Sequence, residues 1–273
     1  LRANALELAY GTILSNGSLW LDGADIDLTG ATTQAWNIAI HAATLTTAGG
    51  ALSATGKGPL VLKASDWIDN TGGRIESNGT LQLDTAEFHN AGGTVRAIGS
   101  GASTITVSGT LDSTGGVLET GGDTVLQAAE LRNAGGVVRT GGSGALYLDV
   151  AGGIDNSAGG YIGAGGDLDL SAQVLDNTRG GIGHAGDGTL TINVDTLDGA
   201  GGTIASNGTL LLSADDVNLR DGSTSASRVV IDADTLVTAG GMLSASGSDP
   251  LAITARTMLD NAGGHIAGNG AFH

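Results

Sequence analysis

The stretch that decides the fold lies near the end of the chain and reads Leu259-Asp260-Asn261-Ala262-Gly263-Gly264-His265-Ile266. The same order of an aliphatic residue, a polar pair, two glycines and a second aliphatic residue recurs at 68–75 and 131–138. At 175–182 the frame is kept, but Arg179 stands where the first glycine belongs. A unit that returns at a fixed spacing indicates a repeat architecture, which must be identified before any single motif is interpreted.

The second residue of each glycine pair serves as an anchor for measuring the repeat. The thirteen anchors are Gly11, Ala31, Gly50, Gly73, Gly93, Gly116, Gly136, Gly160, Gly180, Gly202, Gly222, Gly241 and Gly264. The twelve intervals between the first and the last anchor have a mean of about 21 residues. An aliphatic residue follows two positions later in every unit except two, which have Thr33 and Thr224 there. If the repeat is broken anywhere by a binding site, these two units are where we expect the break.

Each unit contains a second segment of alternating aliphatic residues, as at 210–214. Alternation with a period of two predicts strands with one buried face, and the glycine, asparagine, serine and aspartate between the segments are turn residues. One unit is thus about three short strands and three turns, and it buries its apolar face only by stacking on its neighbours. The sequence predicts an all-β fold, a right-handed parallel β-helix (solenoid) of about 13 coils of roughly 21 residues. Residues 1–273 are expected to form a single β-helical repeat domain, a fragment of a longer filamentous protein.

Two other repeat architectures are excluded. A leucine-rich repeat needs its own leucine and asparagine signature and a helical side, and a propeller blade needs about 40 residues.

Stacking in register predicts columns of like residues. One aliphatic column includes Ile75, Val95, Ile162, Ile182 and Ile204. Another includes Leu60, Leu81, Leu146, Leu168, Leu190 and Leu210. The asparagines before the glycine pairs are Asn70, Asn90, Asn133, Asn177 and Asn261. At a strand spacing of ~4.8 Å such amides can form a hydrogen-bonded ladder.

Composition excludes several classes of protein. Glycine accounts for 49 of the 273 residues and proline for only two, so collagen is excluded, because collagen needs abundant proline. The formal net charge is −17, which leaves no basic face for nucleic acid and would be repelled by an anionic membrane. The chain has no cysteine, hence no disulfide, and no apolar run long enough for membrane insertion as a helix.

The repeat unit resembles the haemagglutinin repeats of large bacterial exoproteins secreted by two-partner systems. These include filamentous haemagglutinin adhesins and contact-dependent growth-inhibition proteins. The best copies run from Leu197 to Leu212 and from Leu259 to Phe272, and the resemblance extends over essentially the whole chain. It implies a filament that is secreted or held on the surface of a Gram-negative bacterium. It also implies two partners, an outer-membrane two-partner-secretion transporter that acts through regions outside this chain, and a receptor on a host or target cell.

Three tryptophans are the candidate ligand contacts: Trp20, Trp36 and Trp67. Trp20 stands between two leucines, so alternation points its indole outward. An exposed indole can stack on a sugar, but it can equally cover a junction between coils.

Other candidates for chemistry are weaker. The five histidines (His41, His89, His184, His265 and His273) show no metal-ligand spacing, so we expect no metal site and no cofactor. Asp215 and Asp216 are adjacent, and Asp232 and Asp234 share a strand face at a separation of about 7 Å. Such carboxylate pairs are what a β-helical polysaccharide-degrading enzyme would need, although solvated acids on an outer face explain them equally well.

We therefore expect a non-enzymatic, structural and adhesive filament segment, a monomeric rod that presents distal receptor-binding or toxin regions to other cells. The alternative is that the segment itself binds a host or target-cell glycan or protein through a lateral face. A third interpretation is a β-helical polysaccharide-degrading enzyme. A spacer should be uniform along its faces, whereas a binding or catalytic site should interrupt the pattern locally.

Overall fold

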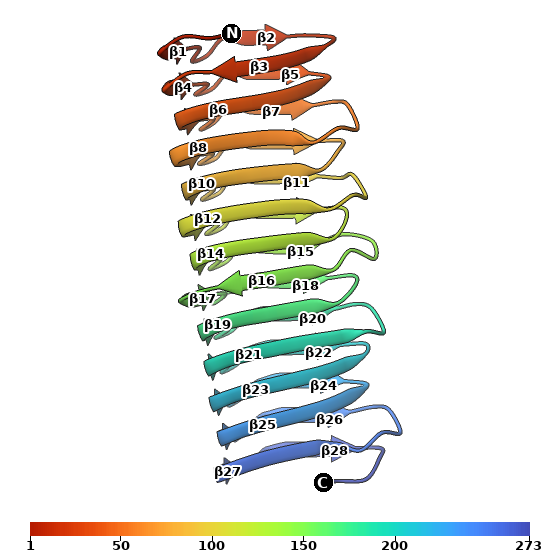
Figure 1. The fold of residues 1–273 in the computed structure, drawn as a ribbon. Helices are drawn as coiled ribbons and strands as arrows, with labels where there is room; N and C mark the ends of the chain where they lie inside the picture. The colour runs from red at the N-terminus through yellow and green to blue at the C-terminus, as the bar shows by residue number, and fades with distance from the viewer.

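The computed structural model describes residues 1–273 as a single stack of coils (Figure 1). All strand pairing is parallel, and the strands form one fifteen-stranded and one thirteen-stranded sheet. The long strands run from right to left across the front of Figure 1 and the short strands return behind them while the chain descends, so the coil is right-handed. The predicted right-handed parallel β-helix of about 13 coils is therefore confirmed.

The fifteen-stranded sheet is called the long-strand sheet. Its strands are β1 (Ala5–Glu7), β3 (Ser18–Asp22), β4 (Asp25–Asp27), β6 (Asn37–Thr46), β8 (Leu60–Asp69), β10 (Leu81–His89), β12 (Ser103–Asp112), β14 (Thr124–Arg132), β16 (Leu146–Val150), β17 (Gly153–Asp155), β19 (Leu168–Asp176), β21 (Thr189–Asp198), β23 (Thr209–Asn218), β25 (Arg228–Val237) and β27 (Ala252–Asp260).

The thirteen-stranded sheet is called the short-strand sheet. Its strands are β2 (Thr12–Leu14), β5 (Thr32–Ala35), β7 (Ala51–Ala54), β9 (Arg74–Ser77), β11 (Thr94–Ala97), β13 (Val117–Thr120), β15 (Val137–Thr140), β18 (Tyr161–Ala164), β20 (Gly181–His184), β22 (Thr203–Ser206), β24 (Ser223–Ala226), β26 (Met242–Ala245) and β28 (His265–Gly268). No helix is present, and hence none that is long and apolar enough to cross a membrane.

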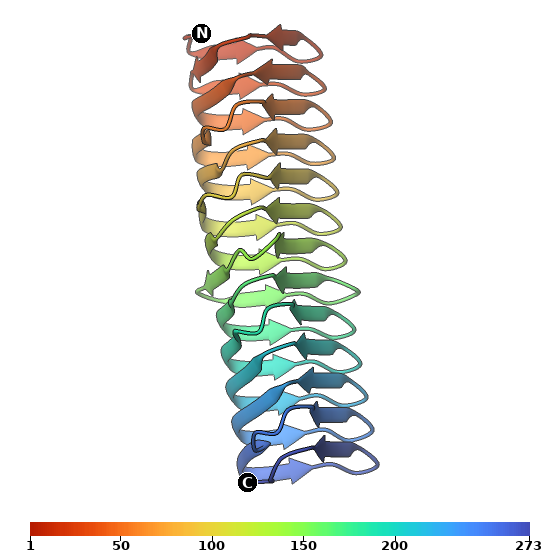
Figure 2. The same ribbon diagram turned by 90° about the vertical axis from the view of Figure 1, so that its right-hand side faces the viewer.

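The prediction of three short strands per coil needs correction. In most coils the first two strands are one continuous strand of nine or ten residues that runs through a bend, as in β6 and β8. The register between these two strands shifts at the bend, between Ala42 and Thr44. Only β3 with β4 and β16 with β17 are separate pieces. Figure 2 shows the coils edge-on, with the bent long strands and the short strands enclosing the core.

Both predicted core columns are confirmed by the register. Ile75, Val95 and Ile204 belong to the first column, which packs inside the short-strand sheet in one cluster of 57 buried apolar residues. The second column is interrupted between Leu81 and Leu146 by Ser103 and Thr124, which are also buried.

The two weaker units do not break the stack. Thr33 pairs with Ile13 on one side and Leu52 on the other, and Thr224 pairs with Ile204 and Leu243. Both threonines point into the aliphatic column, and the Thr33 side chain is 1% exposed. Its hydroxyl has no hydrogen-bond partner there. The two threonines therefore replace aliphatic residues inside the core, and the register of the strands on either side is unchanged.

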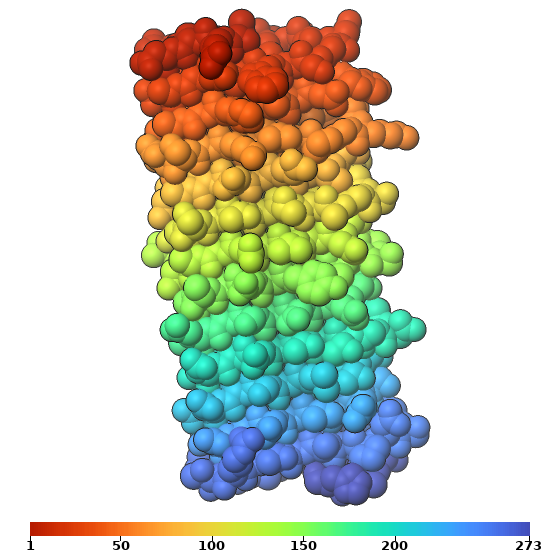
Figure 3. Space-filling view, viewed as in Figure 1, coloured from red at the N-terminus to blue at the C-terminus, as the bar shows by residue number.

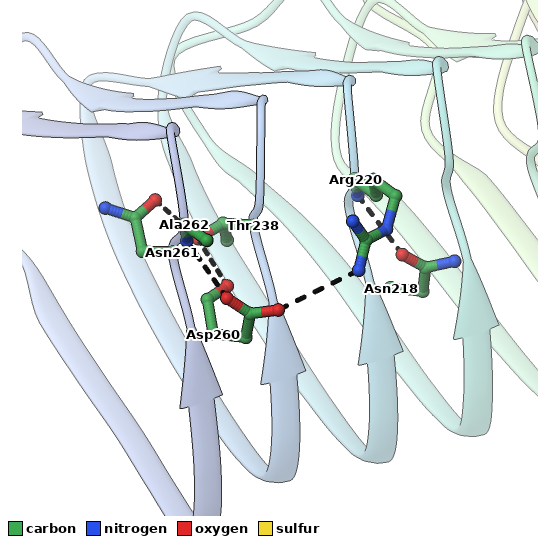
Figure 4. A network of polar contacts seen from close by, with 6 residues as sticks. All are labelled: Asn218, Arg220, Thr238, Asp260, Asn261 and Ala262. Carbon is green, nitrogen blue, oxygen red and sulfur yellow. Dashed lines mark hydrogen bonds and ion pairs between the residues drawn. The ribbon is translucent and has the colours of Figure 1, made fainter.

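The asparagine ladder forms, in separate runs. Thr47 donates to Oδ1 of Asn70 at 2.9 Å, Asn70 donates to Asn90 at 2.8 Å, and Asn90 donates to Oγ of Ser113 at 3.2 Å. A second run leads from Asn133 through Asn156 to Asn177, with two bonds of 2.7 Å. Near the C-terminus Thr238 donates to Oδ1 of Asn261 at 2.9 Å (Figure 4). The asparagines predicted to stack are thus linked, with a threonine or a serine ending each of two runs.

The aspartate before the ladder position closes the turn. Asp260 accepts a hydrogen bond from the backbone N–H of Ala262 at 3.0 Å, and Asn218 accepts one from Arg220 at 3.2 Å (Figure 4). Such side-chain bonds to a backbone N–H two residues ahead are Asx turns. The Arg220 guanidinium also lies 3.8 Å from the Asp260 carboxylate, two coils further along. The repeated Asp-Asn-x-Gly-Gly motif is thus a corner of the coil, and its polar side chains serve the turn and the ladder.

Candidate functional site

The three predicted tryptophans are exposed to different extents. Trp20 in β3 is 55% exposed, as the alternation predicted, and Trp36, just before β6, is 54% exposed. Trp67 lies beyond the bend of β8, pairs with Thr44 and is half-buried. The structure therefore exposes the indoles of Trp20 and Trp36, whereas Trp67 lies beyond the bend of its strand and is partly covered.

A shallow groove of about 330 Å³ lies beside Trp20, and we call it the Trp20 groove. It is lined by Ser18, Leu19, Trp20, Asn37, Ile38, Ala39, Gly58, Pro59 and Val61. None of these residues carries a charge, in a chain with a formal net charge of −17. The indole of Trp20 meets the imidazole of His41 edge to face, with ring centroids 5.3 Å apart. An apolar floor with a serine and an amide at its margin can hold a neutral molecule with both apolar and hydroxyl faces.

Two glycines of the next coil leave space for side chains around this groove. A Cβ at Gly56 would press on Nε1 of Trp36, and one at Gly58 would press on Oδ1 of Asn37. The backbone N–H of Gly56 also donates to the carbonyl oxygen of Trp36 at 2.6 Å. Trp36 is therefore held against the loop that contributes Gly58 and Pro59 to the groove.

A second groove, of about 340 Å³, is lined by His41, whose ring contacts Trp20 of the first groove, and by residues at the bend of the long strands. We call it the bend groove. Its polar lining includes His41, Lys63, Ser65, Asp84 and Ser108. The long-strand sheet turns its outer face toward the viewer in Figure 3, where the surface is even and shows no deep cleft. Both grooves are open surface depressions, suited to binding along a face and not to enclosing a substrate.

Of the two carboxylate pairs considered for catalysis, Asp232 and Asp234 are bound by an arginine. Nη2 of Arg256 lies 2.7 Å from Oδ1 of Asp232, and its Nη1 donates to Oδ1 of Asp234 at 2.9 Å. The hydrogen bond to Asp234 and the charge of Asp232 raise the pKa of Arg256 above its ordinary value. Both carboxylates are thus paired with one cation and neither is a free group, unlike the acid–base pair that glycoside hydrolysis requires.

The histidines lie apart along the chain, and no group of three or more histidine or carboxylate side chains has the geometry to hold a metal ion. His89, His265 and His273 are exposed, and His41 is half-buried. His184 differs from the others because its side chain points into the core.

Comparison with known families gives one match. A family model described as the haemagglutinin repeat matches residues 98–146, 141–191 and 185–271. The three matches together extend over more than half of the chain. No curated protein and no solved structure matches the chain.

Proposed function

The chain belongs to the haemagglutinin-repeat family, and on that premise we propose that it is part of the shaft of a large secreted bacterial exoprotein. Its role is to hold distal receptor-binding or toxin regions away from the cell. The observation that supports this proposal most directly is the unbroken register of the coils, since every short strand from β5 to β26 pairs with the coil before and the coil after. A rod that serves as a spacer must be continuous from end to end, and it does not depend on any single binding site.

The remaining features fit the same role. Haemagglutinin-repeat proteins are generally exported by two-partner systems, so we propose an outer-membrane transporter as the export partner and a Gram-negative cell surface or the medium as the location. Because the chain has no cysteine, it carries no disulfide that would have to form or rearrange on such a route. The excess of acidic residues keeps the rods soluble and apart, which favours a monomer.

The shaft proposal is tested with the purified chain, first shown to be folded and β-rich by circular dichroism. Small-angle X-ray scattering should report an elongated monomer with a length on the order of 60 Å, from thirteen coils at ~4.8 Å each. Labelled chain should show no saturable binding to a glycan panel or to candidate cells. A compact or oligomeric particle would contradict the shaft role, and saturable binding would favour the second candidate.

The second candidate is lateral binding of a neutral glycan in the Trp20 groove. The observation that favours it is an uncharged groove lined by the exposed indole of Trp20 on a strongly acidic rod. A sugar ring would stack on Trp20, and the next ring would meet the polar side chains of the bend groove, among them His41, Lys63 and Asp84.

Substitution distinguishes this contact from simple packing. Trp20→Ala should weaken glycan binding at least about tenfold, because aromatic anchors carry about 2 kcal/mol or more of a binding interface. Trp67→Ala is the matched control, since Trp67 lies beyond the bend of its strand, and it should leave binding unchanged. Equal affinity of the Trp20→Ala variant and the parent chain would end the proposal for this groove.

A further inference from the structure

His184 is the one ionisable side chain in an inward row of small residues. The row follows the last position of the short strands and consists of Ala35, Ala54, Ser77, Ala97, Thr120, Thr140, Ala164, His184, Ser206, Ala226 and Ala245. The His184 residue is only 3% exposed. An imidazole therefore occupies a core position that the other coils fill with alanine, serine or threonine.

Of the two nitrogens of the His184 ring, only Nδ1 has a side-chain hydrogen-bond partner. Nδ1 lies 2.7 Å from Oγ of Ser206 on the following coil. Nε2 is buried and has no partner, whichever of the two groups donates in the first bond. Ser206 is itself fixed, since its Oγ accepts a hydrogen bond from the N–H of Gly208 at 3.1 Å. A second proton on the ring would thus place a cation in the core, where only the backbone of Gly166 and two exposed carboxylates favour it.

The cover over the ring is thin. Nε2 lies beneath the loop that follows β20, where a Cβ at Gly186 would stand 3.1 Å from it. That loop reads Ala185-Gly186-Asp187-Gly188, and the loop of the preceding coil contains Gly165 and Gly166. No side chain of Gly186 shields the ring from water, so a local movement of this loop is enough to hydrate it.

The charged groups that act on the ring are two carboxylates. Burial lowers the pKa of His184, whereas the charges of Asp167 and Asp187 and the backbone of Gly166 oppose that shift only in part. Both aspartates are exposed, and Asp167 already accepts a hydrogen bond from the N–H of Thr189 at 2.8 Å. The neutral ring is therefore the form that the folded coil prefers.

We infer that His184 makes its coil a proton-sensitive joint in the rod. In the folded coil the pKa lies below the ordinary histidine value of 6.5, which the open coil recovers. The open coil therefore binds more protons than the closed one between these two values, and closure is lost as the pH falls through that window. Above the ordinary value the ring is neutral in both states and the coil keeps its full stability. Acidification loosens the rod at this coil and leaves distant coils closed, because each coil contacts only its neighbours.

Hydrogen exchange at pH 7.5 and at pH 5.5, corrected for the intrinsic rate, tests this inference on the whole chain. Protection of amides in β18, β20 and β22 should fall by up to about tenfold per pH unit within the window, which is the linkage limit for one proton. Amides in β9 and β11, several coils away, should not share that loss.

Two variants separate the histidine from the general effect of acid. His184→Thr should abolish the local loss, and it should fold, because Thr140 in the same row already donates to the carbonyl oxygen of Gly144 at 2.7 Å. His265→Thr is the matched control at an exposed position and should behave like the parent chain. An identical local pH response in the parent and in His184→Thr would overturn the inference.

A direct titration needs no variant. The imidazole of His184, followed by NMR in the parent chain, should titrate below the ordinary value of 6.5. A midpoint at or above that value would show that the folded coil accepts the proton without penalty, and the joint would not exist.

Discussion

At the scale of single residues, each of the two glycines of the repeated motif is needed for a different physical reason. The first has a positive φ, about 61° at Gly72 and Gly92, which only glycine adopts freely. The second approaches the previous coil so closely that a Cβ at Gly73 would press on the carbonyl oxygen of Thr47 and on Oδ1 of Asn70. Arg179 takes the first position with φ of 54°, whereas its neighbour Gly180 has the second. A first-position substitution is tolerated at a cost in strain, as at Arg179, whereas the only side chain at the second position is the methyl group of Ala31.

Thr33 provides a prediction at this scale. Thr33→Val should raise the free energy of unfolding by about 1 kcal/mol, because it removes a buried hydroxyl without a partner and keeps the side-chain shape. Thr32→Val, on the exposed face of the same strand, is the control and should change stability by less than about 0.5 kcal/mol. Thermal or urea unfolding measures both. A destabilised Thr33→Val variant would mean that the hydroxyl has a partner, such as a bound water.

Residue columns were predictable from the sequence, but their polar details were not. A fixed spacing identifies Ile75 and Val95 as stacked neighbours, because like residues recur at like positions. Asn156 was missed as a ladder member because its coil has one more residue between the asparagine and the glycine pair. Oδ1 of Asn133 has no partner, whereas the equivalent atoms of Asn70 and Asn261 accept from threonines, a difference that only the register between coils reveals.

At the scale of elements, the bend of the long strands was the feature that the sequence did not disclose. The alternation of apolar and polar residues is interrupted there, so two separate strands were predicted. In the structure, pairing with the neighbouring coils continues on both sides of the bend, and the two segments form one strand. Part of the bend is held by glutamates across coils: Oε2 of Glu87 accepts from the N–H of Thr110 at 2.9 Å, and Oε2 of Glu130 accepts from Gly153 at 3.0 Å. Gly109 and Gly152 leave space for these carboxylates, a pairing visible only after stacking.

In the candidate site, too, the exposure of a single side chain could be predicted from the sequence, but the arrangement of several side chains could not. Outward exposure of Trp20 followed from alternation in one strand, and the structure confirms it. That Trp20 shares a groove with residues of the next two coils, while Trp67 lies beyond the bend of its strand, depends on the path of three successive coils. Whether any of the three binds a ligand stays a prediction.

Ile204 provides the prediction for the strand. Ile204→Asp puts an unpaired charge between Ile182 and Thr224, and it should lower stability by at least about 3 kcal/mol. Because each coil depends on its neighbours, unfolding should separate into two transitions on either side of the lesion. Thr203→Asp, on the outer face of β22, is the control and should melt in one step. A parent-like melt of the Ile204→Asp variant would contradict the inward assignment of this column.

At the scale of the whole molecule, the rod behaves as a sum of coils and interfaces between them. Net charge and length are then additive properties, and no one coil is indispensable to the fold. The exception is register, since all thirteen short strands share one alignment. Removal of a complete coil preserves that alignment, whereas removal of half a coil leaves an incomplete coil whose neighbours lose their strand partners.

Deletion of residues 74–93 tests this additivity. Arg74 and Thr94 are register partners, so joining Gly73 to Thr94 continues the strand at the same place, and Asn70 would then stack on Ser113. The shortened chain should melt cooperatively and lose ~4.8 Å in length by small-angle scattering, one strand spacing. Deletion of 74–83 alone removes half a coil and should yield an aggregated or unfolded chain. If both deletions fold equally well, register between coils does not hold the rod together; if neither folds, the coils are not interchangeable modules and a shaft built by adding them is contradicted.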